Sequence, residues 1–311
     1  MPSLFTVLAL CACLALAACA ESAPAVDPVA RQDAAAPDRA DVPDGAAAPD
    51  GAALDRAAGE GATPDPATGP GAGPSAVVAA RPLWLGTRVL PLRPDGFGEI
   101  QPTPPELDDR RLPPPADDLP PPGEAFAATV ETVPGAVAAR STWSPACPVA
   151  LEDLRYLTVT FWGFDARPHT GELLVHERVA DAMVDVFRAI YDARFPIEEM
   201  RVITAADLDA PATGDGNTTT AFVCRSTVSS GSWSQHAYGL AVDINPFHNP
   251  YARDDVVVPE LASAYVDRGR HRPGMIQPGD AVTQAFATLG WPWGGEWRSA
   301  KDWMHFSHNG R

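Results

Sequence analysis

The uneven placement of aromatic residues limits where this chain can fold. Every aromatic residue except Phe5 lies beyond residue 80. Residues 20–76 are almost entirely Ala, Pro, Gly and Asp with scattered Arg, and Leu54 is their only leucine. Such a stretch cannot bury enough apolar surface to offset the entropy lost on ordering. We therefore expect a disordered Ala/Pro/Gly/Asp-rich tether over residues 19–80 and a folded region nearer the C-terminus.

The first residues indicate export. The apolar run "LFTVLALCACLALAAC" is short for a membrane span and ends at Cys19. Its end resembles the lipobox of bacterial lipoproteins, which implies a signal peptide over residues 1–18 and lipidation of Cys19. No Lys or Arg precedes the run, so an ordinary signal peptide and an uncleaved anchor stay open. All three alternatives predict an extracytoplasmic location at the bacterial surface or in the periplasm, with membrane contact only through the N-terminus.

Cysteine counting agrees with export. Cleavage before Cys19 would leave Cys147 and Cys224 as the cysteines of the folded region. In an oxidising compartment such a pair is most simply a disulfide, and two buried free thiols are the alternative.

Composition also bounds partners and domains. The formal charge is −17 and Lys301 is the single lysine, so no basic stripe predicts nucleic-acid binding. Residues 81–123 are proline-dense and expected to be extended. Whether they pack on the following domain stays open. Residues 124–311 are long enough for one packed core, and we expect a monomer.

The folded region mixes helical and strand patterns. The spacing of apolar residues and the residue types predict strands at residues 84–92, 154–164, 200–208, 220–227, 239–246 and 302–307. The same signals predict helices at residues 172–193 and 281–290. Their irregular alternation favours an α+β fold with a small, mainly antiparallel sheet flanked by helices.

One histidine and one aspartate in "SWSQHAYGLAVDINP" have a spacing that needs explanation. His236 and Asp243 are seven residues apart, so one continuous strand would place them on opposite faces. Gly239 offers a break that could fold His236 back over the face that carries Asp243. His305 in "DWMHF" could supply a third ligand. Two histidines and one carboxylate, with a fourth position for water, are typical of a catalytic zinc site.

The same residues carry a family resemblance. "SQHAYGLAVD" and "DWMHF" resemble the two signatures of zinc D-Ala-D-Ala carboxypeptidases and L-Ala-D-Glu endopeptidases, the VanY-like peptidoglycan metallopeptidases with the Hedgehog/DD-peptidase fold. The resemblance implies Zn²⁺ held by His236, Asp243 and His305, with Asp302 as general base. It also implies that the substrates are peptidoglycan stem peptides. In having an aspartate at position 302, the chain resembles the endopeptidases of the family. This resemblance favours cleavage of the L-Ala-D-Glu bond over removal of terminal D-Ala.

Two further residues are candidates for substrate contacts. Stem peptides carry free carboxylates, which Arg225 could bind, or its guanidinium could stabilise the developing oxyanion. A structural ion pair for Arg225 is an equal alternative. Ser234 is expected to orient the histidine loop or to touch substrate.

Other aromatic and histidine residues have less specific expectations. Trp291, Trp293 and Trp297 could stack on sugar rings, although a place in the core or in the wall of a cleft fits them better. His248 is expected at the surface or beside the metal ligands.

The sequence therefore predicts an exported zinc peptidase of the cell wall. The first alternative is a catalytically inactive, Hedgehog-like zinc-binding module that binds cell wall or a protein partner. The second is a structural lipoprotein in which the tether matters and the domain is inert.

Overall fold

The structure is a computed structural model, and its described residues are 79–115, 119–120, 122–123, 125–227 and 231–311. The expected signal peptide, Cys19 and the tether up to residue 78 lie outside the described residues. None of the helices in this described part combines the length and the apolar character of a membrane span.

A three-stranded antiparallel sheet forms one half of the core. Its order is β1 (Ala128–Thr132), β2 (Leu154–Trp162) and β3 (Pro168–His176). The strand predicted at 154–164 is confirmed as β2. All nine residues of β2 pair with β3, from Leu154 opposite His176 to Trp162 opposite Pro168.

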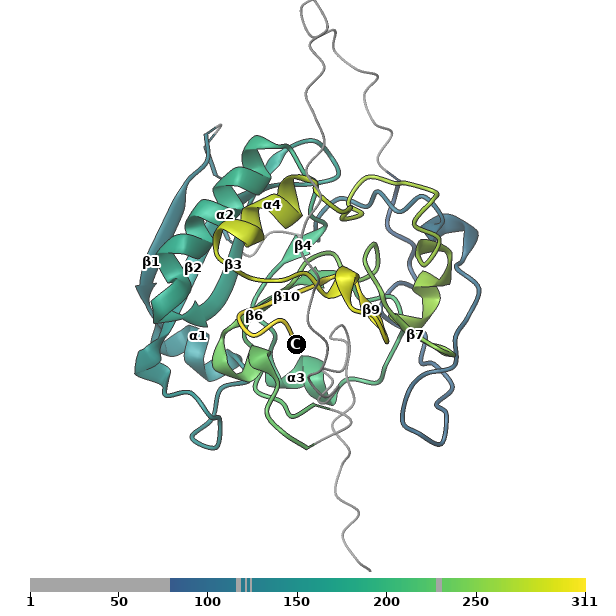
Figure 1. Cartoon of the computed structure of the whole chain (residues 1–311), viewed down its shortest axis with the longest axis horizontal. Coiled ribbons are helices and arrows are strands. Elements are labelled where there is room, and N and C mark those ends of the chain that lie inside the picture. The colour runs from purple at the N-terminus through teal and green to yellow at the C-terminus, as the bar shows by residue number, and fades with distance from the viewer. Residues whose placement is uncertain (1–78, 116–118, 121, 124, 228–230) are drawn as a thin grey trace, which may run out of the picture. The chain divides into compact units, whose positions relative to one another are not determined.

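Both faces of the sheet are largely buried at β2 and β3, whereas β1 is mostly exposed. Helices α2 (Ala180–Asp192) and α4 (Ala281–Thr288) lie together on one face, where Val159 and Phe161 join their core (Figure 1). Tyr156 and its neighbours on the other face pack into a separate cluster near α1 (Gly135–Arg140). The sheet therefore lies between two of the apolar clusters of the domain.

The helix predicted at 172–193 is wrong in its first part. Residues 172–176 belong to β3, and α2 begins at Ala180. Because Leu173 and Leu174 are buried on opposite faces, the sequence there shows a continuous apolar run instead of an alternation. Periodicity alone does not separate such a run from a helix.

The strand predicted at 200–208 is also mostly wrong. Only β4 (Glu199–Met200) is a strand, and α3 (Ala205–Asp209) follows it. The Thr204 and Asp207 side chains each bind the other's backbone N–H. This capping box starts a helix where the apolar pattern suggested a strand.

Two more predicted strands are replaced by turns and irregular pairing. Residues 84–92 form no strand. The backbone N–H groups of Leu85 and Thr87 make turn hydrogen bonds, and an isolated bridge joins Leu92 to Gly98. Residues 220–227 leave regular pairing after a bridge at Thr220. Their backbone instead binds several different segments.

The remaining strands form small sheets, which fits the predicted α+β class. The strands are β5 (Thr218–Thr219), parallel to β4; β6 (Ala241–Asp243) paired with β10 (His305–Ser307); and β7 (Tyr251–Arg253) between β8 (Val256–Val258) and β9 (Lys301–Asp302). The 3₁₀ helices are η1 (Pro105–Leu107), η2 (Leu151–Asp153), η3 (Glu177–Val179), η4 (Gln235–Tyr238), η5 (Glu260–Tyr265) and η6 (Gly294–Glu296). The strand predicted at 302–307 is split, because β9 pairs with β7 whereas β10 pairs with β6. The helix predicted at 281–290 is confirmed as α4, which ends at Thr288, with Gly290 at a positive φ just beyond it.

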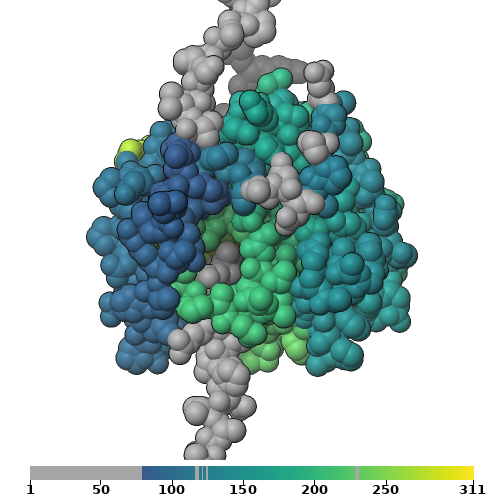
Figure 2. Space-filling model, turned by 180° about the vertical axis from the view of Figure 1, so that it is seen from behind, coloured from purple at the N-terminus to yellow at the C-terminus, as the bar shows by residue number. Residues whose placement is uncertain are grey.

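The N-terminal described segment packs on the domain. Leu107 and Leu112 are fully buried and share a cluster with Phe247 and Tyr265. Figure 2 shows this segment, in blue, against the green middle of the chain on the rear face, with a hollow between them. The proline-rich stretch is thus, up to residue 115, part of the folded unit.

Candidate metal centre

A capped turn places His236. Ser234 precedes η4, and its hydroxyl accepts a hydrogen bond from the His236 backbone N–H at 3.3 Å. The turn ends at Gly239, whose φ is +67°. A Cβ there would lie 2.6 Å from the His176 backbone nitrogen, so only glycine fits. The interruption of the strand that was expected at Gly239 is therefore present, and β6 begins two residues later.

A short antiparallel ladder brings the other two residues together. In the pairing of β6 with β10, Asp243 lies directly opposite His305. The His305 Nδ1 is 2.9 Å from one Asp243 oxygen, and the His236 Nε2 is 3.2 Å from the other. All three side chains are buried, and one ligand atom from each lies within 4.8 Å of the others. The structure thus brings His236, Asp243 and His305, the three residues expected as metal ligands, together.

The outer nitrogens of both histidines face backbone carbonyls. The His236 Nδ1 is 2.5 Å from the Ala221 oxygen, and the His305 Nε2 is 3.2 Å from the Arg311 oxygen. A carbonyl only accepts, so each outer nitrogen must carry the proton in a neutral ring. The inner nitrogens therefore present lone pairs toward the Asp243 carboxylate.

Three acceptors around one point require a positive charge between them, either a metal ion or a bound proton. The His236 Nε2 is buried and makes no hydrogen bond within the described residues, as expected for an atom reserved for a metal. Two imidazole nitrogens and one carboxylate oxygen are donors that zinc prefers, and the carbonyl contacts are the partners that usually orient its histidine ligands. The residues present fit a zinc ion.

Electrostatics keep Asp243 ionised. Burial alone would raise the pKa of this carboxyl, but a proton held between it and the His236 or His305 ring outweighs burial through its charge and its hydrogen bond, and so holds the pKa well below its usual range. The group is consequently a carboxylate at neutral pH, as metal binding requires.

Asp302 lies close along the chain to the metal residues. It ends β9 opposite Tyr251, and a two-residue turn separates it from His305. Its side chain is buried. The pKa of Tyr251 is raised above its ordinary value, mainly by burial and to a smaller extent by the charge of Asp302. Gly294 packs on this residue so closely that a Cβ would meet the Asp302 carbonyl oxygen at 2.5 Å.

Arg225 lies beside the histidine turn. The Ser234 N–H donates to the Arg225 carbonyl at 3.2 Å, and the Val223 N–H donates to the His236 carbonyl at 3.2 Å. The Arg225 side chain is buried. The predicted disulfide between Cys147 and Cys224 is confirmed, with the two Cα atoms 5.8 Å apart, and it fixes the residue before Arg225.

Sequence reasoning missed several parts of the site. The Ala221 and Arg311 carbonyls are backbone atoms, which no residue pattern reveals. Trp297 lies beside the site, with its ring centre 5.7 Å from that of His305, whereas Trp291 and Trp293 are core residues. The tryptophan cluster was thus a usable signal, although the sequence did not single out Trp297.

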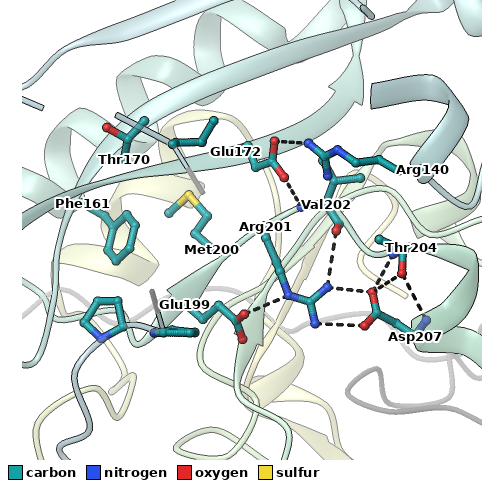
Figure 3. Close-up of a pocket in the computed structure, with 13 residues that line it drawn as sticks. Arg140, Phe161, Thr170, Glu172, Glu199, Met200, Arg201, Val202, Thr204 and Asp207 are labelled. Atoms are coloured by element: carbon teal, nitrogen blue, oxygen red, sulfur yellow. Dashed lines mark hydrogen bonds and ion pairs between the residues drawn. The ribbon is translucent and has the colours of Figure 1, made fainter. Parts of the chain in front are cut away.

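A pocket of about 520 Å³ is lined by none of the three metal residues (Figure 3). Its carboxylates are already paired within the chain. Arg201 binds Glu199 at 2.8 Å and Asp207 at 2.7 Å, and Glu172 accepts from the Tyr156 hydroxyl at 2.7 Å. The pocket therefore offers a structural ion network and not the chemistry of the metal centre.

Comparison with known proteins gives one family match, over the part of the chain that contains the candidate metal residues. Residues 227–308 match a protein-family model described as D-alanyl-D-alanine carboxypeptidase. This span contains His236, Asp243, Asp302 and His305. Neither the curated proteins nor the solved structures gave a significant match. The family match indicates a peptidase of the kind that acts on peptidoglycan, and thus action outside the cytoplasm.

Proposed function

We propose that this protein is a zinc peptidase that hydrolyses peptide bonds in the stem peptides of peptidoglycan. The observation that carries the proposal is the convergence of three buried acceptor atoms from His236, Asp243 and His305 on one point. The match of residues 227–308 to a carboxypeptidase family supports the reaction class.

Zinc bound by these three residues would supply a Lewis acid and lower the pKa of a coordinated water toward 7. The protein's own groups would do the rest. Asp302 takes the proton of the attacking water as its oxygen bonds to the carbonyl carbon. When the C–N bond breaks, the same carboxyl returns that proton to the leaving amine nitrogen. Water is thereby divided between a new carboxylate and a new amine.

Arg225 and Ser234 would act on the substrate and on the loop. The Arg225 guanidinium is proposed to bind a stem-peptide carboxylate or the developing oxyanion. Ser234 is proposed to hold the turn, because its hydroxyl already accepts from the backbone N–H of His236.

Two bonds are candidates for cleavage. Aspartate at position 302 favours the L-Ala-D-Glu bond through the resemblance to endopeptidases. The matching family model is described by the other activity, removal of D-alanine from D-alanyl-D-alanine. The two differ in product, because the first leaves a new amino terminus on D-Glu and the second releases free D-Ala.

We also propose that the protein is a monomer anchored through a lipid on Cys19. The 19–80 tether would let the domain over residues 124–311, together with the segment up to residue 115 that packs on it, reach the wall. Nucleic acid is not an expected partner, because the chain is acidic and has one lysine.

Digestion of purified peptidoglycan, followed by mass spectrometry of the fragments, tests the proposal. Wild-type protein should release one of the two products, and the Asp302→Asn variant and chelator-treated protein should not. A protein that binds zinc and leaves the wall intact would instead be the inactive binding module. A protein that binds no zinc would fit the structural lipoprotein.

A further inference from the structure

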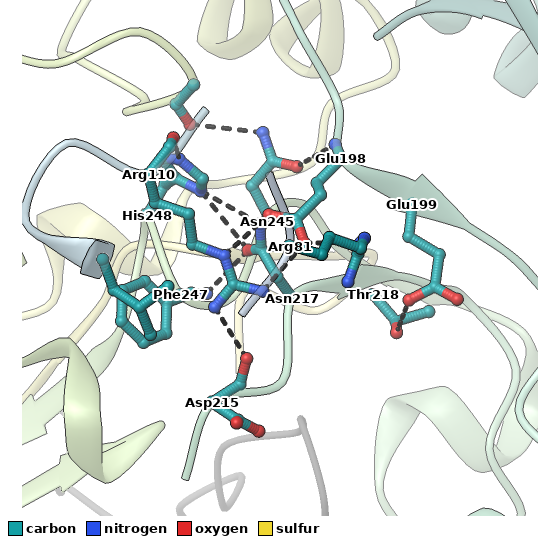
Figure 4. A network of polar contacts seen from close by, with 12 residues as sticks. Arg81, Arg110, Glu198, Glu199, Asp215, Asn217, Thr218, Asn245, Phe247 and His248 are labelled. Carbon is teal, nitrogen blue, oxygen red and sulfur yellow. Dashed lines mark hydrogen bonds and ion pairs between the residues drawn. The ribbon is translucent and has the colours of Figure 1, made fainter. Parts of the chain in front are cut away.

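Arg110 joins the N-terminal segment to the middle of the chain through a buried ion pair. Its Nε and Nη2 bind the two oxygens of Glu198 at 2.7 and 2.8 Å, and its Nη1 donates to the Asp215 carbonyl at 2.7 Å (Figure 4). The side chains of Arg110 and Glu198 are 2% and 1% exposed. A two-point pair of this kind fixes both position and orientation.

The backbone of Arg110 is engaged as well. Its N–H donates to the Tyr265 hydroxyl at 2.9 Å, and its carbonyl is 2.8 Å from the His248 Nε2. One residue of the N-terminal segment thus contacts four separate parts of the domain. His248, expected near the surface or the metal ligands, is fully buried in this network instead.

Arg110 also makes the burial of Glu198 possible. Burial raises the pKa of this carboxyl, yet the charge and hydrogen bonds of Arg110 outweigh it and keep the pKa below its ordinary value. Asn217 donates to the same carboxylate at 2.7 Å, and Arg81 at 2.9 Å. Without Arg110, the carboxylate would lose its two-point partner in a buried place.

The network continues to the residues that follow the ligand Asp243. The backbone N–H of Glu198 donates to the Asn245 side-chain oxygen at 3.1 Å, and the Asn245 amide donates to the Pro196 carbonyl at 2.8 Å. Asn245 has a φ of +45°, in the left-handed region that few residues other than glycine and asparagine adopt. Its hydrogen bonds hold this conformation two residues after Asp243.

A second contact holds the same stretch of chain. The Asn217 side-chain oxygen accepts from the Phe247 N–H at 2.9 Å, while its amide donates to Glu198. The segment after β6 is therefore held from two sides by residues that contact Glu198, Asn245 at its backbone N–H and Asn217 at its carboxylate.

We propose that Arg110 and Glu198 are positioning residues for the metal centre. Their ion pair holds the chain after β6 and thereby sets the place of the Asp243 carboxylate. This inference rests on the proposed zinc site. It extends beyond the family likeness, because Arg110 and Glu198 both lie outside the matching span 227–308.

The test measures Zn²⁺ affinity by competition with a fluorescent chelator, together with the thermal unfolding midpoint, and uses the whole exported chain. Arg110→Met keeps the bulk of the side chain and removes the ion pair. Arg111→Met is the matched control, because Arg111 is the neighbouring residue, has a side chain that is 35% exposed and forms a surface ion pair with Asp109. Leu107→Ala is a second control, since it loosens the packing of the same segment without removing a polar contact of the network.

The expected result is that Arg110→Met weakens Zn²⁺ binding by about tenfold, as loss of a residue that orients a metal ligand does. Arg111→Met leaves the affinity unchanged, and Leu107→Ala lowers the unfolding midpoint with little effect on the affinity. The proposal is overturned if Arg110→Met and Leu107→Ala both lower the midpoint while both bind Zn²⁺ like wild type.

A further variant covers the case in which Arg110→Met does not fold. Asn245→Gly suits the positive φ, so it removes the side-chain contacts to Glu198 and Pro196 with little backbone cost. It should still weaken Zn²⁺ binding, and an unchanged affinity would refute the proposal. If wild type itself binds no Zn²⁺, the zinc site proposed above fails first, and the two failures are thus distinguishable.

Discussion

The buried His248 should make the protein lose stability as the solution becomes acidic. Its ring stacks on Phe164 with centres 4.8 Å apart, donates from Nε2 to the Arg110 carbonyl and lies 3.1 Å from the Asn217 amide nitrogen. These contacts suit the neutral ring, in which one nitrogen donates and the other accepts. Burial lowers the pKa of His248 from 6.5 to about 4, and Glu198 opposes this shift only in part.

The sign and size of the effect follow from these two pKa values. Below pH 6.5 the unfolded chain binds a proton at His248 that the folded protein refuses, so the free energy of unfolding falls as the pH drops. The stabilisation is complete above pH 6.5 and is lost toward pH 4. The full loss is about 3 kcal/mol, because each unit of pKa difference is worth about 1.4 kcal/mol.

Urea unfolding of wild type and His248→Gln at several pH values measures this loss. Glutamine retains a donor for the Arg110 carbonyl but does not titrate. All other titratable groups are the same in both proteins. The difference between the two curves of unfolding free energy against pH therefore isolates the contribution of His248. The gap between wild type and variant should narrow by about 3 kcal/mol as the pH falls. Parallel curves would refute the buried neutral state of this ring.

Further predictions concern the disulfide, the glycine turn and the metal. Reduction of Cys147–Cys224, which are 77 residues apart, should lower the free energy of unfolding by about 4 to 5 kcal/mol, measured in urea with and without reductant. Gly239→Ala should destabilise the fold more than Gly290→Ala, because both glycines have a positive φ but only the first faces a backbone atom, the His176 nitrogen, at 2.6 Å. Equal unfolding midpoints for the two variants would contradict the steric argument. Zn²⁺ at 100 times its Kd should raise the free energy of unfolding by about 3 kcal/mol. In calorimetry, excess chelator should lower the unfolding midpoint of the zinc-loaded protein to that of the metal-free protein.

The sequence predicted His236 and Asp243 because their chemistry and spacing are local, whereas His305, 62 residues beyond Asp243, was assigned through the family resemblance. The odd separation of His236 and Asp243 required a break, and Gly239 was the residue able to make one. The pairing of Asp243 with His305 then needed only that the last strand lie beside β6. The disulfide followed from counting cysteines.

Other features depend on contacts that no local pattern encodes. Residues 172–176 became a strand because β2 pairs with them and both faces are covered, which hides the alternation. Arg110 and Glu198 are 88 residues apart, and proline-rich surroundings suggested that Arg110 was part of an extended spacer. The helix over α3 was missed because its capping box lies inside an apolar run.

Crystals grown with Zn²⁺ and measured at the zinc absorption edge would show whether His236, Asp243 and His305 hold the ion. We expect one anomalous peak per chain, about 2.0 to 2.2 Å from the His236 Nε2, the His305 Nδ1 and an Asp243 oxygen, with a coordination position open to solvent. An anomalous map without a peak among these three residues, or with the zinc bound elsewhere in the protein, would contradict this expectation.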